Sequence, residues 1–245
     1  SDAAKTEETL EQIRQAFFER GLESAWGRCV AIVVRNGAAF GPEKVWDYDS
    51  EKNKDLKMMI RNRGNLVFEA HSTDFQTQDA LTGMVRDHFA ILKVGPCLTF
   101  AMREAFFALS FIEQELLKDR RGAVLSKLPE TILDLMMNDR ANWQNHYRGN
   151  ESYLRYISAY GFSDRIRYYW SNSRVADAVA ILFHNMTQYG IPLPLLSQFM
   201  PAQYEEVRES RIPCTPKHLV KSKIMETLGR YAEEIGRASC RERVC

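Results

Sequence analysis

Residues 65–76 read NLVFEAHSTDFQ, and residues 87–109 read DHFAILKVGPCLTFAMREAFFAL. Each stretch contains a short apolar run typical of a buried strand, and polar residues follow each run. A long helical pattern beginning near Thr99 comes directly after the second run. In parallel α/β proteins, chemistry is placed just past the carboxyl ends of the strands. The two stretches therefore predict an α/β fold and the position of a functional site within it.

Strand and helix patterns alternate over residues 6–117. Strands are predicted at 29–34, 66–70 and 89–94, and helices at 6–22, 50–60, 77–88 and 99–117, with Ser50 and Thr77 as N-caps. The run CVAIVV at 29–34 is apolar throughout, as expected of a strand covered on both faces. Strand–helix units of this length imply parallel strands joined by right-handed crossovers.

Three such units are too few for a closed eight-stranded barrel, which takes about 250 residues. We interpret residues 1–118 as the C-terminal part of a TIM (β/α)8 barrel, its last three strand–helix units, with the N-terminal half missing. The alternative is an open three-stranded sheet, which would leave an edge and one face of strand 29–34 uncovered. Because three strands cannot close a barrel, we expect apolar surface to be exposed.

From residue 119 onward the pattern is helical, and residues 119–234 are predicted to form a helical C-terminal extension that packs on the barrel. Separate helices are predicted around residues 132–136, 143–147, 175–183 and 219–231. Residues 235–245 (IGRASCRERVC) lack apolar periodicity and resemble the translation of a sequencing adapter. We therefore exclude this tail from the predicted fold.

Composition and charge limit the classes of protein to which this sequence could belong. Hydrophobic residues make up 45% and charged residues 27%, which is ordinary for a globular domain. The formal charge is 33 − 32 = +1, or 30 − 31 = −1 without the tail, so neither nucleic acid nor an anionic membrane is an expected partner. No apolar run is long enough to span a membrane. The polar N-terminus and three widely spaced cysteines outside the tail favour a cytoplasmic protein.

The strand that ends at residue 70 carries the first candidate site. Glu69 and His71 are two residues apart, so they project to the same side, and Ser72 and Asp74 follow in the loop. A carboxylate and an imidazole so placed could bind a divalent metal such as zinc or manganese, or serve as base and acid. The alternative is a hydrogen-bonded pair with a structural role. The five histidines show no HxH or HExxH spacing, so a self-contained metal site is not expected.

Lys93 interrupts the apolar run of the third strand. An ammonium on a buried strand needs a carboxylate or phosphate partner, because leaving it unpaired costs several kcal/mol. Lys93 could form a Schiff base, contact a sugar phosphate, or pair with Glu69 or Asp74. Gly95, at the entry to the next helix, could help to receive a phosphate on free backbone N–H groups.

An Arg/Tyr-rich stretch spans residues 147–170. Arg165 and Arg167 in this stretch are candidate anion contacts. Stacking on RNA is the alternative, but the balanced charge favours a packed helical surface with Arg–carboxylate pairs.

Four motifs carry a resemblance to one family: FEAHSTDFQT (68–77), DHFAILKVGPCLTFAMREAFFAL (87–109), SDRIRYYW (163–170) and IPLPLLSQFMPAQY (191–204). Over residues 3–234 the chain resembles the Z-type, non-catalytic subunit of D-tagatose-1,6-bisphosphate aldolase, the GatZ/KbaZ family. The resemblance implies a bacterial, cytoplasmic TIM barrel similar to the class II aldolases. It also implies that the missing N-terminal half holds the first five strands.

The resemblance implies an accessory role: supporting the activity and stability of the catalytic Y-type subunit in the catabolism of galactitol, N-acetylgalactosamine and tagatose 6-phosphate. His71 falls where class II aldolases have a zinc-binding histidine, but Ser-Thr-Asp follows it instead of a glycine-rich phosphate loop. After strand 29–34 the family pattern Val-Gln-Pro-Gly-Val-Glu-Phe is replaced by VRNGAAF at 34–40. The first departure favours a subunit without aldolase chemistry, and the second argues against a functional site at the end of strand 29–34.

An enzymatic alternative stays open at this point. Some relatives resemble metal-dependent C4-epimerases of ketohexoses or ketohexose phosphates, and Glu69 with His71 would supply part of such a site. A third hypothesis, tagatose-6-phosphate kinase, is not favoured because the sequence has no nucleotide-binding motif.

Overall fold

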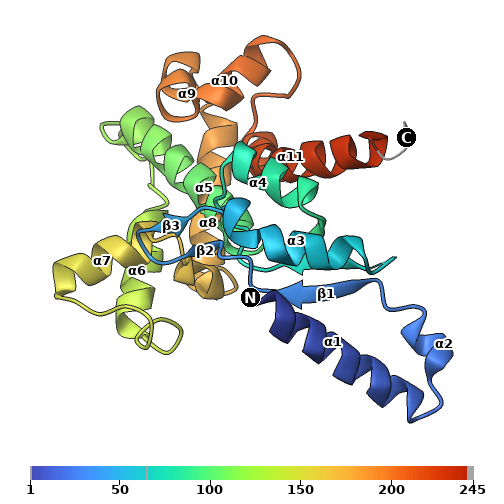
Figure 1. Cartoon of the computed structure of the whole chain (residues 1–245). Coiled ribbons are helices and arrows are strands. Elements are labelled where there is room, and N and C mark those ends of the chain that lie inside the picture. The colour runs from blue at the N-terminus through green and yellow to red at the C-terminus, as the bar shows by residue number, and fades with distance from the viewer. Residues whose placement is uncertain (1, 65, 242–245) are drawn as a thin grey trace. The chain divides into compact units, whose positions relative to one another are not determined.

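The structure is a computed structural model that describes residues 2–64 and 66–241 (Figure 1). The chain forms two compact units, which are described separately. The sheet unit lies within residues 1–40, 44–95 and 229–245, and the helical unit within residues 41–43 and 96–228. The predicted domain division at residue 118 stays a prediction.

A three-stranded parallel sheet is the centre of the sheet unit. Its strands are β1 (Ala31–Val34), β4 (Val67–Ala70) and β5 (Phe89–Leu92), in the order β1-β4-β5. Val33 of β1 lies opposite Glu69 of β4, which lies opposite Ile91 of β5. The register between β4 and β5 shifts by one residue after Phe68, which marks a β-bulge. The predicted helix-rich α/β fold with a parallel sheet is confirmed.

Helices cover one face of this sheet. The sheet unit contains α1 (Ala3–Phe18), α2 (Glu23–Trp26), the 3-10 helix η1 (Glu51–Asn53), α3 (Lys54–Arg61), α4 (Gln78–Arg86), the end of α11 (Pro216–Arg241) and a short antiparallel pair, β2 (Ala39–Phe40) with β3 (Val45–Trp46). Val34, Phe68 and Phe89 are buried in one apolar cluster with side chains of α3 and α4. The β2–β3 pair was not predicted from the sequence.

The other face of the sheet is open. Val33 is 52% exposed and Ile91 is 39% exposed, although both are apolar strand residues. The prediction that strand 29–34 is covered on both faces is therefore wrong, because the apolar cluster lies on one side only within the described residues. The expectation of exposed apolar surface is confirmed. The described strands form a small open sheet, so the barrel belongs to the proposals below.

In this unit one of the two predicted helix caps is confirmed, and the other is wrong. Thr77 is confirmed as an N-cap, since its side chain accepts a hydrogen bond from the Ala80 N–H. Ser50 makes no such bond, and Asp49 Oδ1 instead accepts from the Glu51 N–H (3.0 Å). The helix predicted to reach residue 88 ends at Arg86, and His88, which was assigned to it, has a left-handed φ of 71°.

The helical unit is a bundle with one continuous core. Its helices are α5 (Pro96–Leu117), α6 (Leu128–Asn138), α7 (Glu151–Tyr160), the 3-10 helix η2 (Arg165–Tyr169), α8 (Ser173–Gln188), α9 (Leu193–Phe199), α10 (Pro201–Arg208) and the start of α11. The helices predicted around 132–136, 175–183 and 219–231 are confirmed. Residues 143–147 form turns instead of a helix, and Trp143 is buried with its Nε1–H donating to the Met136 carbonyl (2.8 Å).

Two further points concern the whole chain. Helix α11 continues through the first part of the tail predicted to be an artefact, and residues 242–245 lie outside the described residues. Among the residues that the structure describes, no helix is both long and apolar enough to cross a bilayer.

Candidate functional site

The predicted Glu69–His71 pair lies at the carboxyl end of β4. Glu69 Oε1 and His71 Nε2 are 2.8 Å apart, so the two side chains are hydrogen-bonded to each other. Their side chains are 28% and 44% exposed, respectively. The register places Glu69 between Val33 and Ile91, on the open face of the sheet. The sequence therefore placed this pair correctly on one side of the strand.

Lys93 lies just past β5 and is exposed. The bulge puts Ile91 opposite Glu69, so two residues further on Lys93 follows His71 on the same open face. Within the described residues its ammonium forms no ion pair with Glu69 or Asp74. The expected need for a buried partner does not arise, because solvent reaches the ammonium at the open face.

Arg35 follows β1, the remaining strand of the parallel sheet. It follows Val33 by two residues, and alternating exposure continues past β1, with Val33 and Arg35 exposed and Val34 and Asn36 buried. The open face thus presents Arg35, His71 and Lys93 after β1, β4 and β5. Sequence reasoning missed Arg35, although its spacing from the apolar strand residues was a usable signal.

The loop after His71 is largely buried, unlike a loop poised to bind substrate. Thr73 is fully buried and Asp74 is 3% exposed. Thr73 Oγ1 donates to the Lys93 carbonyl (2.8 Å), and its own carbonyl accepts from Tyr231 Oη (2.7 Å). Ser72 has a left-handed φ of 59°, which the bonds on either side of it hold in place.

Asp74 and Gly95 are brought together, but by a bond to each other. The Gly95 N–H donates to Asp74 Oδ1 over 2.9 Å. This amide, expected to be free for a phosphate, is therefore already engaged. Ser72, Asp74 and Gly95 stay predicted phosphate contacts. The bond between Asp74 and the Gly95 amide gives these two residues a structural role.

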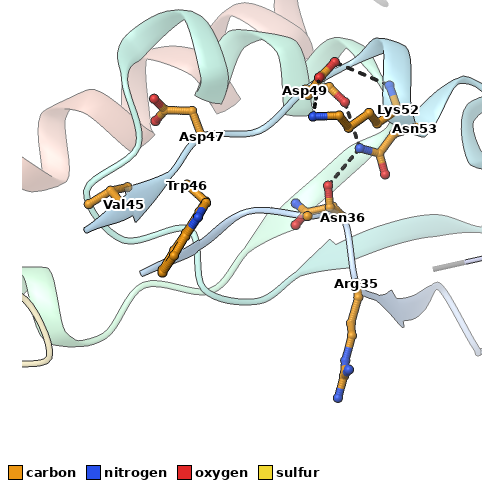
Figure 2. A pocket seen from close by; sticks show the side chains of 9 residues that line it. Arg35, Asn36, Val45, Trp46, Asp47, Asp49, Lys52 and Asn53 are labelled. Atoms are coloured by element: carbon orange, nitrogen blue, oxygen red, sulfur yellow. Dashed lines mark hydrogen bonds and ion pairs between the residues drawn. The ribbon is translucent and has the colours of Figure 1, made fainter. Parts of the chain in front are cut away.

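A cavity of about 440 Å³ lies beyond the end of β1 (Figure 2). Polar residues of its lining include Arg35, Asn36, Asp47 and Asn53, and the 47% exposed Trp46 contributes its indole. In Figure 2 the Arg35 side chain projects away from the Asn36–Asn53 contact. Sequence reasoning missed this cavity because it is formed by the loop around the unpredicted β2–β3 pair.

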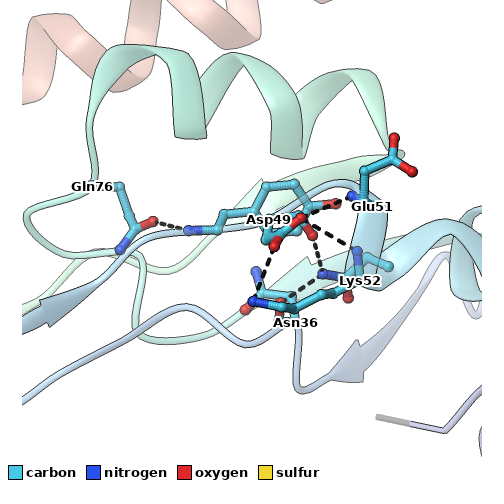
Figure 3. A network of polar contacts seen from close by, with 7 residues as sticks. Asn36, Asp49, Glu51, Lys52 and Gln76 are labelled. Carbon is cyan, nitrogen blue, oxygen red and sulfur yellow. Dashed lines mark hydrogen bonds and ion pairs between the residues drawn. The ribbon is translucent and has the colours of Figure 1, made fainter.

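A hydrogen-bond network fixes one wall of the cavity (Figure 3). Asn53 is buried, and its Nδ2 donates to the carbonyls of Asn36 (2.8 Å) and Asp49 (2.9 Å). Asp49 Oδ2 pairs with Lys52 Nζ at 3.0 Å. Gln76 binds the adjoining segment, accepting from the Tyr48 N–H (2.8 Å). These groups are mutually satisfied, so this wall is rigid.

Arg165 and Arg167 lie together in η2 of the helical unit. Arg167 Nη1 donates to the Asp164 carbonyl (3.0 Å), and Arg165 Nη1 contacts the Asn142 carbonyl at 3.5 Å. Arg165 Nε is buried without a hydrogen-bond partner. Neither guanidinium has a carboxylate within salt-bridge distance in the described part of the chain. The Arg–carboxylate pairing predicted for residues 147–170 is confirmed at Arg155, which lies 3.4 Å from Glu151 and 3.7 Å from Asp134. Arg165 and Arg167 stay candidate anion contacts.

The donor set at the strand ends does not by itself fit a metal. Zinc sites take three or four protein ligands, whereas Glu69 and His71 supply two that bind each other. Over residues 2–64 and 66–241 no three His, Cys, Asp or Glu side chains gather into a metal-binding group. Glu69 and His71 alone therefore do not complete a metal-binding site.

These features define an α/β protein with a parallel sheet whose polar side chains gather past the carboxyl ends of the strands. The chain belongs to the GatZ/KbaZ-like family of D-tagatose-1,6-bisphosphate aldolase subunits, whose sequence model matches residues 1–235. The resemblance seen in the sequence motifs is thereby confirmed.

A solved structure extends this relationship. The crystal structure of a probable tagatose 6-phosphate kinase from Sinorhizobium meliloti is 38% identical in sequence and has a TM-score of 0.89. The match covers 96% of this chain and 60% of that protein. The present chain therefore spans about 60% of the length of that relative.

Proposed function

We propose that this protein is an accessory, non-catalytic subunit that binds the catalytic class II subunit of tagatose-1,6-bisphosphate aldolase. It supports that subunit's activity and stability in the catabolism of galactitol, N-acetylgalactosamine and tagatose 6-phosphate in the bacterial cytoplasm. Family membership over residues 1–235 supports a role as an aldolase subunit. The pathway and the partner are part of the proposal.

The proposal includes a barrel fold. Residues 1–118 would form its last three strand–helix units, and residues 119–234 a helical extension. The two faces of the sheet support this, since Phe68 and Ala70 are buried against helices while Val33 and Ile91 are exposed on the opposite face. In a barrel, one face of each strand packs on the outer helices and the other faces the interior.

One observation carries the non-catalytic role. The strand-end groups that could do chemistry are bound to neighbouring groups of the same unit: Glu69 to His71, and Asp74 to the Gly95 amide. Thr73 and Asp74 of the loop after His71 are buried, and Thr73 ties this loop to the Lys93 carbonyl. Groups engaged in this way stabilise the sheet edge, and catalysis would require these bonds to be broken.

Co-expression with the catalytic subunit tests the proposal. We expect soluble yield and aldolase activity of the partner to rise when this protein is present, and the two proteins to elute together in size-exclusion chromatography. A Glu69→Gln variant should support the partner nearly as well, because the carboxamide can still bond to His71. The accessory role is lost if neither yield nor activity of the partner changes.

The metal-dependent C4-epimerase is the second candidate, because Glu69 and His71 are both partly exposed at a strand end. The purified protein, alone and with Mn, Zn or Ni, is incubated with fructose 6-phosphate, and tagatose 6-phosphate is measured. Turnover without a partner that disappears in Glu69→Gln would replace the accessory role by the epimerase. We do not propose kinase activity for this chain, although the Sinorhizobium protein is named as a probable kinase, because this sequence has no nucleotide-binding motif.

A further inference from the structure

A cavity of the helical unit lies between α10 and the first part of α11, and we name it the α10–α11 cavity. Its volume is about 480 Å³, which is within the range of small-molecule sites. Lys221, Ser222 and Met225 line it from one face of α11, since they are one residue or one turn apart. Gln203 and Glu206 line it from α10.

Buried polar side chains form part of this lining and hold it in place. Gln203 is 3% exposed, and its Nε2 donates to Ser222 Oγ over 3.3 Å. The Ser222 hydroxyl, which is also buried, donates in turn to Glu206 Oε2. The Arg211 N–H, in the loop between the two helices, donates to the Glu206 carbonyl over 2.9 Å. The Glu206 carboxylate is therefore positioned at the cavity by groups from both helices.

Two opposite charges of the lining do not neutralise each other. Glu206 and Lys221 both line the cavity, yet neither forms an ion pair with the other or with any other side chain that the structure describes. The other carboxylate and the other permanent cation of the lining, Glu226 and Arg211, are each paired with a neighbouring residue. The carboxylate of Glu206 and the ammonium of Lys221 therefore face one cavity from separate positions.

An apolar surface accompanies these charges. Met225 is 51% exposed although its side chain is apolar, and it lines the cavity together with Ile212 and Ala202. A methionine side chain is flexible and polarizable, so it can pack against apolar groups of different shapes. Covering such a side chain with an apolar group removes both surfaces from water, which favours binding.

We propose that the α10–α11 cavity binds a zwitterion that carries an apolar side chain, the chemistry shared by a free aliphatic amino acid and a short peptide. Glu206 binds the ammonium of this ligand, Lys221 binds its carboxylate, and Met225 packs against its side chain. Hydrogen bonds between such charged groups are the strong ones. A simple anion would be repelled by Glu206 and a simple cation by Lys221, so a ligand with both charges fits best.

This site does not depend on the accessory role proposed above. Its lining lies in the helical unit, whereas the strand-end groups lie in the sheet unit. Binding of the zwitterion is measured on the purified chain without a catalytic subunit, so either proposal can fail while the other stands.

Isothermal titration calorimetry at pH 7 tests the inference, with leucine and alanyl-leucine as probes. Each probe is compared with its N-acetyl derivative, which lacks the ammonium, and with its amide, which lacks the carboxylate. We expect a zwitterionic probe to bind, and its two derivatives to bind about tenfold more weakly or worse, because each loses a charge-assisted hydrogen bond. Tighter binding of leucine identifies a free amino acid as the ligand, and tighter binding of alanyl-leucine identifies a peptide.

Three variants assign the parts of the ligand to residues. Glu206→Gln should weaken the zwitterionic probe about tenfold and leave its N-acetyl derivative unchanged, whereas Lys221→Met should weaken the probe about tenfold and leave its amide unchanged. Met225→Ala should weaken leucine and leave glycine, which has no side chain, unchanged. Lys221 and Met225 are exposed, so their variants retain the test if Glu206→Gln does not fold.

Matched controls come from the same two helices. Glu205→Gln and Lys217→Met change exposed residues of α10 and α11 that are not part of the lining, and both should leave the affinity unchanged. Circular dichroism verifies that each variant is folded. The inference is overturned if neither zwitterionic probe binds at millimolar concentration, or if the N-acetyl and amide derivatives bind as tightly as the probes. It is also overturned if the control variants weaken binding as much as Glu206→Gln and Lys221→Met do.

Discussion

The helical unit and the sheet unit differ in how completely they bury their apolar side chains. In the helical unit, Ile112, Leu128 and Ile132 are completely buried in one cluster drawn from α5 to α11. In the sheet unit, Phe68 is completely buried, but Val33 on the opposite face of the sheet is half exposed. The helical unit therefore closes its core, whereas the sheet unit packs one face of its sheet and leaves the other face exposed.

Buried carboxylates show the same contrast. Glu113 of the helical unit is 2% exposed and accepts from the Ser126 N–H (3.1 Å) and Asn185 Nδ2 (2.6 Å). It joins two segments of the core. In the sheet unit, Glu69 is partly exposed, and its partner among the described residues is His71. Substitution of Glu113, which joins two segments of a core, should therefore change stability very differently from substitution of Glu69, which orients a neighbouring side chain.

The largest expected effect comes from apolar truncation. Ile132→Ala should lower the free energy of unfolding of the helical unit by about 2–5 kcal/mol, because it leaves a cavity in a fully packed core. Ile91→Ala, on the open face, should cost less than about 1 kcal/mol. Urea unfolding followed by peptide-resolved hydrogen exchange measures both. Equal losses would remove the distinction between the two units.

Truncation of Glu113 is next in size. Glu113→Ala should destabilise the helical unit by about 3 kcal/mol, since it leaves the Ser126 and Asn185 donors buried without an acceptor. Glu115→Ala is the control on the same helix, because Glu115 and its partner Lys118 are nearly half exposed. That change should cost less than about 0.5 kcal/mol. A Glu113→Ala variant as stable as Glu115→Ala would show that the buried carboxylate does not hold the core.

The pH dependence of the two units should have opposite signs. Burial raises the pKa of Asp164 in the helical unit to about 6, although the Thr99 hydroxyl and the Arg103 and Arg167 charges oppose the rise. A raised pKa in the folded state stabilises the fold at low pH, and this contribution is lost as the pH rises from about 4 through 6.

Asp87 in the sheet unit behaves in the reverse way. Burial alone would raise its pKa, but the bonds from Lys57, Ser50 and Tyr48 together lower it. Its contribution to stability is therefore present above the usual pKa of an aspartate, near pH 4, and is lost as the pH falls through the lowered value.

An Asp164→Asn variant tests this difference. Asparagine tolerates the left-handed φ of 47° at this position and can still accept from Thr99. At pH 7.5 the variant should be more stable than the wild type by about 1–3 kcal/mol, and the advantage should vanish by pH 4. Denaturant unfolding at both pH values measures it. A variant that is less stable at pH 7.5 would contradict the buried charge.

The smallest expected effect comes from matched helix caps. Thr77 accepts from the Ala80 N–H in the sheet unit, and Asn150 accepts from the Tyr153 N–H (2.9 Å) in the helical unit. Thr77→Ala and Asn150→Ala should each cost about 1 kcal/mol, because local capping does not depend on the surrounding core. Thermal unfolding measures both. A several-fold larger loss in one unit would show that its cap also contributes to tertiary packing.

Local patterns predicted much of the fold. The strands β1, β4 and β5, the Thr77 cap and the helices α6 and α8 were found from periodicity and capping alone. The turns at 143–147 were missed because buried aromatic residues mimic a helical pattern there. The Ser50 cap was misassigned because Asp49 and Ser50 are both good caps, and the long-range bond from Ser50 to Asp87 decided between them.

In the candidate site, too, contacts within one strand could be predicted, whereas contacts that depend on strand pairing could not. The contact between Glu69 and His71 follows from residues two apart on one strand, so the sequence could predict it. The bond between Asp74 and Gly95 depends on how two strands pair, and so does the position of Arg35 relative to Lys93. Strand register is a tertiary property, so the sequence could not show that the Gly95 amide is engaged.

The bulge between β4 and β5 shifts the register of these two strands by one residue. Phe68 lies opposite Phe89, but Glu69 lies opposite Ile91, so Ala90 is the extra residue. Deleting Ala90 would restore plain alternation and leave Lys93 on the open face, because Glu69 already lies opposite Ile91. Deleting Leu92, which follows the bulge, would instead turn Lys93 to the face covered by helices while leaving every charged residue in the sequence.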